Sequence, residues 1–556
     1  MAPAMAAPPP AALALLVLLA VAASLAGADD PYRYFTWTVT YGPISPLGTT
    51  QQGILINGQF PGPRIDCVTN DNLIVTIINN LDEPFLLTWN GIKQRKNSWQ
   101  DGVAGTNCPI PPNGGNYTYK FQAKDQIGTF FYFPSLALHR AAGGFGAINV
   151  YQRPQIPVPY PPPAGDFTLL VGDWYKSGHQ QLRQALDSGA GALPPPDGIL
   201  INGATSPAAF VGELGKTYLF RVSNVGMKVS VNVRIQGHSL RLAEVEGTHP
   251  VQNTYDSLDV HAGQSLAFLV TLNQPPMDYA VVVSSRFAPA NLTAVGTLHY
   301  AGATARAPGP LPPPPPAAAA DYGWSLNQAR SFRWNLTASA ARPNPQGSFH
   351  YGAITTSRTL VLASSSAAIA GGGVGRRCAV NGVSFVVPDT PLKLADNYNI
   401  ANVIEWDSIP LRPAAAAGGA AALRAGTPVV RLNLHEFVEV VFQNTENELQ
   451  SWHLDGYDFW VVGYGNGQWT EMQRQTYNLV DAQARHTVQV YPNGWSAILV
   501  SLDNQGMWNL RSAIWDRQYL GQQLYLRVWT PEQSFSNEYS IPTNAILCGR
   551  AAGLPH

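Results

Sequence analysis

The sequence predicts an all-β protein built from β-sandwiches. Short runs of β-branched residues or alternating polar and apolar residues recur along the chain, for example over 73–78, 117–121 and 429–434. Asn, Asp, Gly and Pro bound these runs, which is typical of strands separated by turns. Helical patterns are few, and the best of them covers 178–188. Repeated strand signals with few helices favour sheet-on-sheet packing.

Two proline-rich stretches divide the chain. The first covers 153–165 and the second covers 308–320, where five consecutive prolines occur at 312–316. Such stretches form stiff, extended connectors. An Ala/Gly-rich stretch over 413–426 is expected to be a flexible loop. The predicted domains are therefore 31–153, 166–305 and 345–548.

Length and composition agree with several folded domains. The chain has 556 residues, of which 45% are hydrophobic and 12% are charged, and its net charge is -1. This length suits three or four domains, and the apolar content argues against disorder. The absence of a basic run argues against a nucleic-acid partner.

The N-terminus is typical of a secretory signal peptide, predicted over 1–28. An apolar run covers 11–24, and the small residues Ala26 and Ala28 stand at cleavage-site spacing. An uncleaved anchor is the alternative. No other segment is apolar enough to predict a transmembrane helix, and the residues 548–556 lack the hydrophobic tail of a GPI signal.

Secretion agrees with the glycosylation motifs and the cysteine count. Asn-x-Thr sequons place candidate glycans on Asn116, Asn291 and Asn335. An even number of cysteines in a secreted chain predicts two disulfides, with three possible connectivities. The four cysteines are Cys67, Cys108, Cys378 and Cys548.

Several segments together resemble the plant multicopper oxidases, the ascorbate oxidase and laccase family. The resemblance covers about 32–549 and implies three cupredoxin-like Greek-key β-sandwich domains. The amino-acid sequences of 86–99 and 451–457 are similar to those of the SKU-type proteins and the pollen ascorbate-oxidase homologues. The segments that carry the family resemblance are 56–63, 87–92, 97–102, 108–112, 128–132, 450–463 and 504–521.

An oxidase of this family holds a blue copper with two His, one Cys and an axial ligand, and a three-copper cluster with eight His. Imidazole and thiolate are the donors that suit copper. The resemblance places these ligand positions on residues of which only His453 is a histidine. The matching residues are Thr88 and Asn90, Phe133 and Ser135, Gln450, His453 and Asp455, Arg511, Ser512 and Ala513, then Arg517 and the axial Gln522.

These residue types predict that neither copper site forms. Phe133 and Ala513 have no donor atom, and Ser512 replaces the thiolate. Arg511 and Arg517 place permanent cations where a cation would bind. The eleven histidines include no His-x-His pair, so no metal or other cofactor is expected.

We hypothesise that the replacements interact with one another. If the fold matches the family, Asp455 faces Arg511 and Arg517, and a carboxylate–guanidinium pair would stabilise the former copper cavity. Three other acidic groups are predicted to have solvated or turn roles, since charged residues are mostly exposed. They are Asp173, the pair Glu244 and Glu246, and the pair Glu446 and Glu448.

The family resemblance implies the disulfide Cys108–Cys548. This pairing leaves Cys67 and Cys378 as a second pair by elimination.

The resulting functional prediction is a secreted, glycosylated, non-catalytic protein of the plant cell wall or apoplast. It would act in directional growth or pollen tube growth through a wall polysaccharide or an apoplastic protein, with peripheral association at the plasma membrane left open. One alternative is a copper-dependent oxidase of the L-ascorbate oxidase type. The other is a carbohydrate-binding wall protein that uses aromatic surfaces, such as those of Trp89, Trp452, Trp469 or Trp508.

Overall fold

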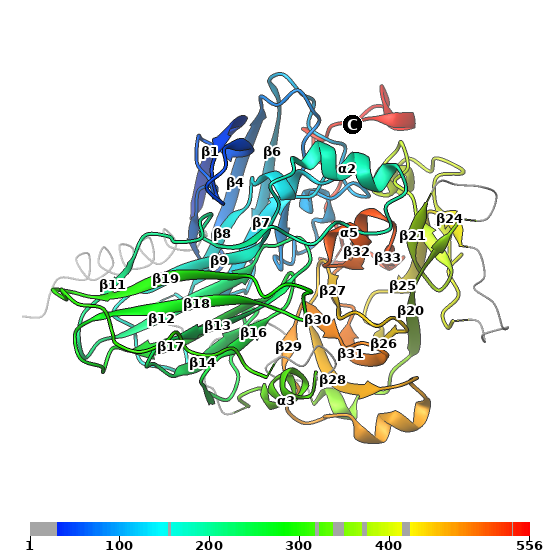
Figure 1. Ribbon diagram of the computed structural model, residues 1–556. Helices are drawn as coiled ribbons and strands as arrows, with labels where there is room; N and C mark the ends of the chain where they lie inside the picture. The colour runs from blue at the N-terminus through cyan, green and yellow to red at the C-terminus, as the bar shows by residue number, and fades with distance from the viewer. Residues whose placement is uncertain are drawn as a thin grey trace, which may run out of the picture.

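The computed structural model describes residues 31–153, 157–316, 322–336, 350–369, 375–413, 423–535 and 537–556. The predicted signal peptide 1–28 lies outside the described residues. The strands form six sheets, which pair into three sandwiches that follow one another along the chain (Figure 1). The protein is thus all-β with three cupredoxin-like domains, as predicted.

The first domain contains the four-stranded sheets β2-β1-β4-β6 and β3-β8-β7-β5. β4 shows why these segments form strands, because every second side chain of β4 is buried between the sheets. β1 and β4 pair in parallel, with Trp37 opposite Ile77. The strands are β1 Tyr32–Ile44, β2 Gln51–Ile56, β3 Ile65–Val68, β4 Asn72–Asn79, β5 Leu87–Asn90, β6 Gly115–Gln122, β7 Gly128–Pro134 and β8 Gly146–Tyr151.

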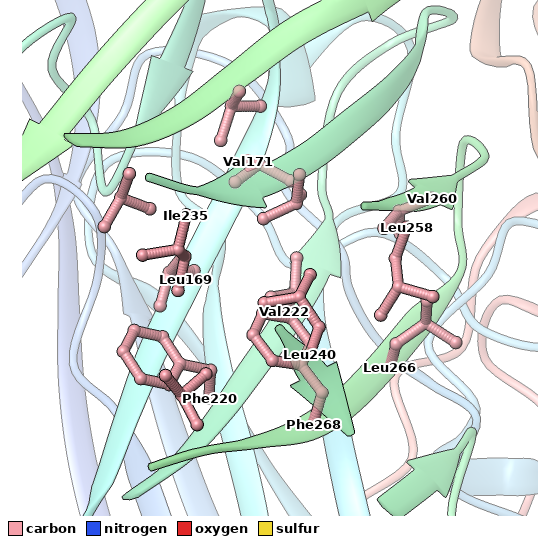
Figure 2. Close-up of a cluster of buried hydrophobic side chains, with 14 of the residues drawn as sticks. Leu169, Val171, Phe220, Val222, Ile235, Leu240, Leu258, Val260, Leu266 and Phe268 are labelled. Carbon is pink, nitrogen blue, oxygen red and sulfur yellow. The ribbon is translucent and has the colours of Figure 1, made fainter. Parts of the chain in front are cut away.

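The second domain contains the sheets β10-β9-β12-β17-β14-β15 and β11-β19-β18-β13-β16. Figure 2 shows its core, where Phe220 and Phe268 stack at 5.6 Å between aliphatic side chains. The strands are β9 Asp166–Trp174, β10 Gly198–Ile201, β11 Phe210–Gly212, β12 Thr217–Asn224, β13 Ser230–Ile235, β14 Leu240–Val245, β15 Thr254–Tyr255, β16 Leu258–Val260, β17 Ser265–Thr271, β18 Asp278–Arg286 and β19 Thr293–Tyr300.

The third domain contains the sheets β24-β22-β21-β20-β26-β31-β28-β29 and β23-β25-β33-β32-β27-β30. All eight residues of β26 are buried, so this strand is covered on both faces. The strands are β20 Arg358–Ala368, β21 Arg376–Val380, β22 Val383–Phe385, β23 Glu405–Trp406, β24 Arg424–Gly426, β25 Pro428–Asn433, β26 Phe437–Asn444, β27 Gln450–Leu454, β28 Phe459–Asn466, β29 Ala484–Arg485, β30 Thr487–Val490, β31 Gly494–Ser501, β32 Gly506–Ser512 and β33 Gln523–Trp529.

The described helices are short. The helix expected over 178–188 is α2, in which His179, Leu182 and Leu186 form one buried face. No helix among the described residues is long and apolar enough to cross a membrane. The α-helices are α2 His179–Asp187, α3 Gly323–Ser331, α4 Leu392–Asn397 and α5 Trp515–Tyr519, and the 3-10 helices are η1 Ser98–Gln100, η2 His139–Ala142, η3 Tyr351–Ala353, η4 Glu471–Thr476 and η5 Gly549–Ala551.

One prediction about the connecting segments needs correction. The described part of the first proline-rich stretch, 157–165, contains no helix or strand. The loop predicted over 413–426 is wrong at its end, because Arg424–Gly426 pairs with β22 as a short strand. Residues 414–422 lie outside the described part of the chain.

The C-terminal segment returns to the first domain (Figure 1). Cys108 and Cys548 form the disulfide that the resemblance implied, across 440 residues of chain. The second predicted disulfide is wrong. Cys67 is on β3 in the first domain, whereas Cys378 is on β21 in the third, and both are free and buried.

Candidate functional site

The predicted copper-ligand positions lie on two pairs of neighbouring strands. In the first domain, β5 and β7 place Thr88 directly opposite Phe133. In the third domain, β27 and β32 place His453 opposite Arg511. Two hydrogen-bonded groups of side chains form at the third-domain positions, one around Asp455 and one around Gln450.

The first group centres on a buried ion pair. A guanidinium nitrogen of Arg511 donates to Asp455 Oδ2, so the hypothesised pair is present. Arg511 also donates to Asn509 Oδ1 at 3.2 Å. The side chains of Arg511 and Asp455 are 1% and 3% exposed, so this pair is removed from water. Charge-assisted hydrogen bonds of this kind are strong because the surrounding medium has a low dielectric constant.

His453 is held by the same pair. Its Nε2 lies 3.0 Å from Asp455 Oδ1, and its Nδ1 lies 2.8 Å from Thr487 Oγ1. Burial and the positive charge of Arg511 lower the pKa of His453 to about 3. The imidazole is therefore neutral at neutral pH, and it donates from Nε2 to Asp455 while Nδ1 accepts from Thr487.

The carboxyl groups of Asp101 and Asp455 lie next to each other, and their pKa values shift in opposite directions. Burial would raise the pKa of Asp455, but Arg511 and His453 outweigh burial and hold this pKa well below its usual range. Burial and the negative charge of Asp455 instead raise the pKa of Asp101 well above its usual range. Asp455 is thus the carboxylate and Asp101 the neutral acid of the pair.

The first-domain positions near this group are filled by packing and by hydrogen bonds to the backbone. The Arg140 guanidinium lies 4.1 Å from the centre of the Phe133 ring, and Trp515 packs edge-on against Phe133 at 5.1 Å. Burial lowers the pKa of Arg140 to about 9, so this residue remains a cation at neutral pH. The remaining polar side chains donate to carbonyl oxygens: Thr88 to Asp101, Asn90 to Gly263 and Ser135 to Gly102.

The second group forms a closed ring of four side chains. A guanidinium nitrogen of Arg517 donates to Glu446 Oε2, and Arg517 Nε donates to Gln522 Oε1 at 2.6 Å. Gln522 Nε2 donates to Gln450 Oε1 at 3.0 Å, and Gln450 Nε2 donates to Glu446 Oε2 at 2.9 Å. Ser512, at the position of the family's thiolate, accepts from the Ile514 amide at 3.2 Å.

The residues at these positions do not fit the copper ions of the family. Each group contains a guanidinium that is bound to a carboxylate, where a metal cation would need a free anionic or neutral donor. The side chain of Phe133 and the methyl group of Ala513 fill positions that need imidazoles. His453 is the one imidazole among the twelve positions, and both of its nitrogens are engaged.

Two predictions about individual acidic residues are wrong, because Asp173 lies in β9 and Glu244 in β14 and both are buried. Glu246 and Glu446 lie in turns, as predicted, and Glu446 also belongs to the hydrogen-bonded ring. Glu246 accepts from the backbone amides of His486 and Thr487, which joins the second domain to the third. Glu448 is exposed, as predicted.

The aromatic residues proposed for carbohydrate binding do not form a surface. Trp89, Trp452, Trp469 and Trp508 are all at most 5% exposed. They pack inside the domains, as Trp452 does against Phe442 at 5.0 Å. This observation excludes these four tryptophans as a carbohydrate-binding surface.

No sequence pattern marks Asp101, Glu446 or Thr487 as members of these groups. One signal was available for Glu446, because a buried guanidinium such as that of Arg517 requires a nearby carboxylate. A third cluster also has no marker in the sequence: Glu83, His139 and His179 come together at the junction of the first two domains.

The fold and the arrangement of these positions define a three-domain cupredoxin protein of the oxidase type. Three family profiles described as multicopper oxidase match residues 38–155, 165–303 and 389–534. The chain therefore belongs to the multicopper oxidase family.

Its relatives fall at two levels of similarity. An "L-ascorbate oxidase homolog" of Nicotiana tabacum is 51% identical over 549 residues, covering 98% of this chain and 97% of the relative. The "Monocopper oxidase-like protein SKU5" of Arabidopsis thaliana is 48% identical, and the alignment covers 97% of this chain and 93% of the relative. An "L-ascorbate oxidase" of Cucurbita pepo var. melopepo is 29% identical, and the alignment covers 94% of this chain and 98% of the relative.

Among solved structures, a laccase from Botrytis aclada superposes with a TM-score of 0.73 at 24% identity, covering 90% of this chain and 88% of the laccase. At this identity the likeness supports the fold.

Proposed function

We propose that this protein is a secreted, non-catalytic multicopper-oxidase-like protein that acts by binding in the plant cell wall or apoplast. The observation that carries the proposal is the pair of rebuilt copper positions, in which Arg511 and Arg517 are bound to Asp455 and Glu446. A chain without copper at these positions has no route for electrons from a substrate to oxygen. Its contribution then lies in its surface and its stable fold.

The relatives support the biological setting of the proposal. The chain is more similar to the oxidase homologue of Nicotiana tabacum and to SKU5 than to an L-ascorbate oxidase, at 51% and 48% against 29%. We propose a role in directional growth or pollen tube growth, with a wall polysaccharide or an apoplastic protein as the partner.

The exposure of two sequons supports secretion and glycosylation. Asn116 and Asn291 are exposed, so an oligosaccharide can be attached at each without disturbing the core. Asn335 is partly buried, and Thr337 of its sequon lies outside the described residues. The Cys108–Cys548 disulfide agrees with an oxidising compartment.

The test is to express the protein with excess copper, purify it from the medium, and measure ascorbate-dependent oxygen uptake. We expect no uptake above a heat-inactivated sample, whereas an authentic ascorbate oxidase in the same assay turns over. Turnover that rises with added copper would overturn the proposal in favour of the oxidase. Retention of the purified protein on pectin or cellulose, compared with a copper-free albumin control, then distinguishes a polysaccharide partner from a protein partner.

A further inference from the structure

A cluster of one carboxylate and two imidazoles lies at the junction of the first and second domains, and none of its three residues is at a copper position of the family. Glu83 lies between β4 and β5, His139 begins η2, and His179 begins α2. His179 Nε2 lies 3.1 Å from Glu83 Oε1, and His139 Nε2 lies 3.4 Å from Glu83 Oε2. One candidate ligand atom from each residue lies within 4.8 Å of the other two.

These spacings suit a tetrahedral metal ion. Nitrogen and oxygen ligands lie about 2.0–2.2 Å from zinc, so neighbouring ligand atoms of a tetrahedral site are about 3.3–3.6 Å apart. The two imidazole–carboxylate separations, 3.1 and 3.4 Å, are close to this value. Both histidines direct Nε2 at the carboxylate. An ion bound to the two Nε2 atoms, with each neutral ring carrying its single proton on Nδ1, would meet three ligands.

The three side chains are held in place by their neighbours. The Tyr41 hydroxyl donates to Glu83 Oε1 at 2.8 Å, and the Tyr41 ring stacks on His179. The Phe85 ring stacks on His139 at 6.0 Å. Outer partners that orient a metal ligand are a regular part of metal sites. The cluster is therefore preorganised by contacts that do not depend on the ion.

The cluster also has an open side. Glu83 and His139 line a cavity of about 430 Å³ between the first and third domains. The side chain of Glu83 is 20% exposed, whereas those of His139 and His179 are 2% and 5% exposed. Arg183, which lines the same cavity, is paired with Asp187 at 3.4 Å. The cavity offers an entry path and room for a water or substrate ligand on the ion.

We propose that Glu83, His139 and His179 form a binding site for a divalent transition-metal ion, with zinc as the ion that best suits two imidazoles and one carboxylate. Copper(II) binds the same donors and competes at equal concentration, because affinities generally peak at copper. This site is independent of the proposed function, since it uses none of the copper positions of the family.

The experiment titrates the full-length secreted protein, first treated with a chelator, with Zn²⁺ by isothermal calorimetry. We expect one high-affinity ion per chain. Glu83→Gln and His179→Gln should each weaken binding at least tenfold, since loss of even an outer-shell partner costs about 10- to 100-fold. The matched control is His299→Gln, because His299 Nδ1 faces only Asp278, at 2.6 Å, in a partly exposed pair. This control should keep the affinity of the wild type.

A second measurement covers the case in which a variant does not fold. Electron paramagnetic resonance of the wild type with one equivalent of Cu²⁺ should show coupling to two imidazole nitrogens. Failure of the folded wild type to bind Zn²⁺, equal affinity in the wild type and a folded Glu83→Gln variant, or a copper spectrum without imidazole nitrogen would each overturn the proposal.

Discussion

Two buried clusters of imidazole and carboxylate in this protein differ in what neutralises the carboxylate. At the positions of the family's copper cluster, Asp455 is neutralised by Arg511, and His453 is a neutral hydrogen-bonding neighbour. At the domain junction, Glu83 faces the imidazoles of His139 and His179 and an adjoining cavity. A guanidinium keeps its charge and cannot be a ligand, whereas an imidazole can exchange a proton for a metal ion. The partner of the carboxylate therefore decides which cluster can accept a metal ion.

Removal of the buried cation should have the largest effect on stability. Arg511→Ala leaves Asp455 buried and unpaired, which should lower the free energy of unfolding by about 3–5 kcal/mol. The measurement is urea unfolding of Arg511→Ala, Asp455→Ala and the double variant. Because the two groups act as a pair, the double variant should lose less than the sum of the single losses. Additive losses would show that the pair does not hold this region together.

Acidification should have the next largest effect on stability. Burial holds the pKa of both His453 and His261 at about 3, against 6.5 in an unfolded chain. Between these values the unfolded chain binds protons that the folded chain does not, so stability falls as the pH drops below 6.5. Each histidine contributes about 1.4 kcal/mol per pH unit.

The check is the free energy of unfolding measured from pH 7 to pH 4 for the wild type and His453→Gln. The slope should be shallower in the variant. An unchanged slope would mean that His453 is already protonated in the folded protein.

The ring of four side chains should tolerate change better than the buried ion pair. Arg517 is 11% exposed and Glu446 is 22% exposed, so water can partly replace a lost partner. Arg517→Ala should therefore cost about 1–3 kcal/mol, less than Arg511→Ala. Thermal unfolding of the two variants side by side gives the comparison, and the reverse order would contradict the role assigned to burial.

The junction cluster should contribute least to stability in the absence of metal. The Glu83 carboxylate has four hydrogen-bonding partners, Tyr41, His139, His179 and Gln180, and Glu83→Gln keeps one oxygen acceptor while it removes a charge from a partly exposed site. The metal-free variant should lose about 0.5–1.5 kcal/mol, the range of a single hydrogen bond. With Zn²⁺ present, the melting temperature of the wild type should rise and that of Glu83→Gln should not. A loss as large as that of Arg511→Ala would make the cluster a structural element instead of a binding site.

Strand periodicity predicted the all-β fold, because it is a local property of the chain. The family resemblance implied the three cupredoxin domains and led to the hypothesis that Asp455 faces Arg511. The sequence did not predict the partner of Arg517, since Glu446 lies 71 residues away and its approach depends on how β26 and α5 pack. The same limit explains the junction cluster. Glu83, His139 and His179 are separated by 56 and 40 residues, so no short spacing marks them as neighbours.

The Cys67–Cys378 prediction was wrong for a related reason. Elimination assumes that every cysteine has a partner, but these two lie in different domains and both are buried. A buried thiol behaves as a small apolar side chain. The cysteine count alone therefore could not separate a bridge from two core residues.

The most direct test counts copper in the purified protein. The wild type and Glu83→Gln are saturated with Cu²⁺, dialysed against a weak chelator, and examined by elemental analysis and visible absorption. The account predicts no blue-copper absorption in either protein, one copper per chain in the wild type and none in Glu83→Gln. Blue absorption, or two or more coppers per chain that survive in Glu83→Gln, would contradict the claim that the family's copper positions have been rebuilt as ion pairs.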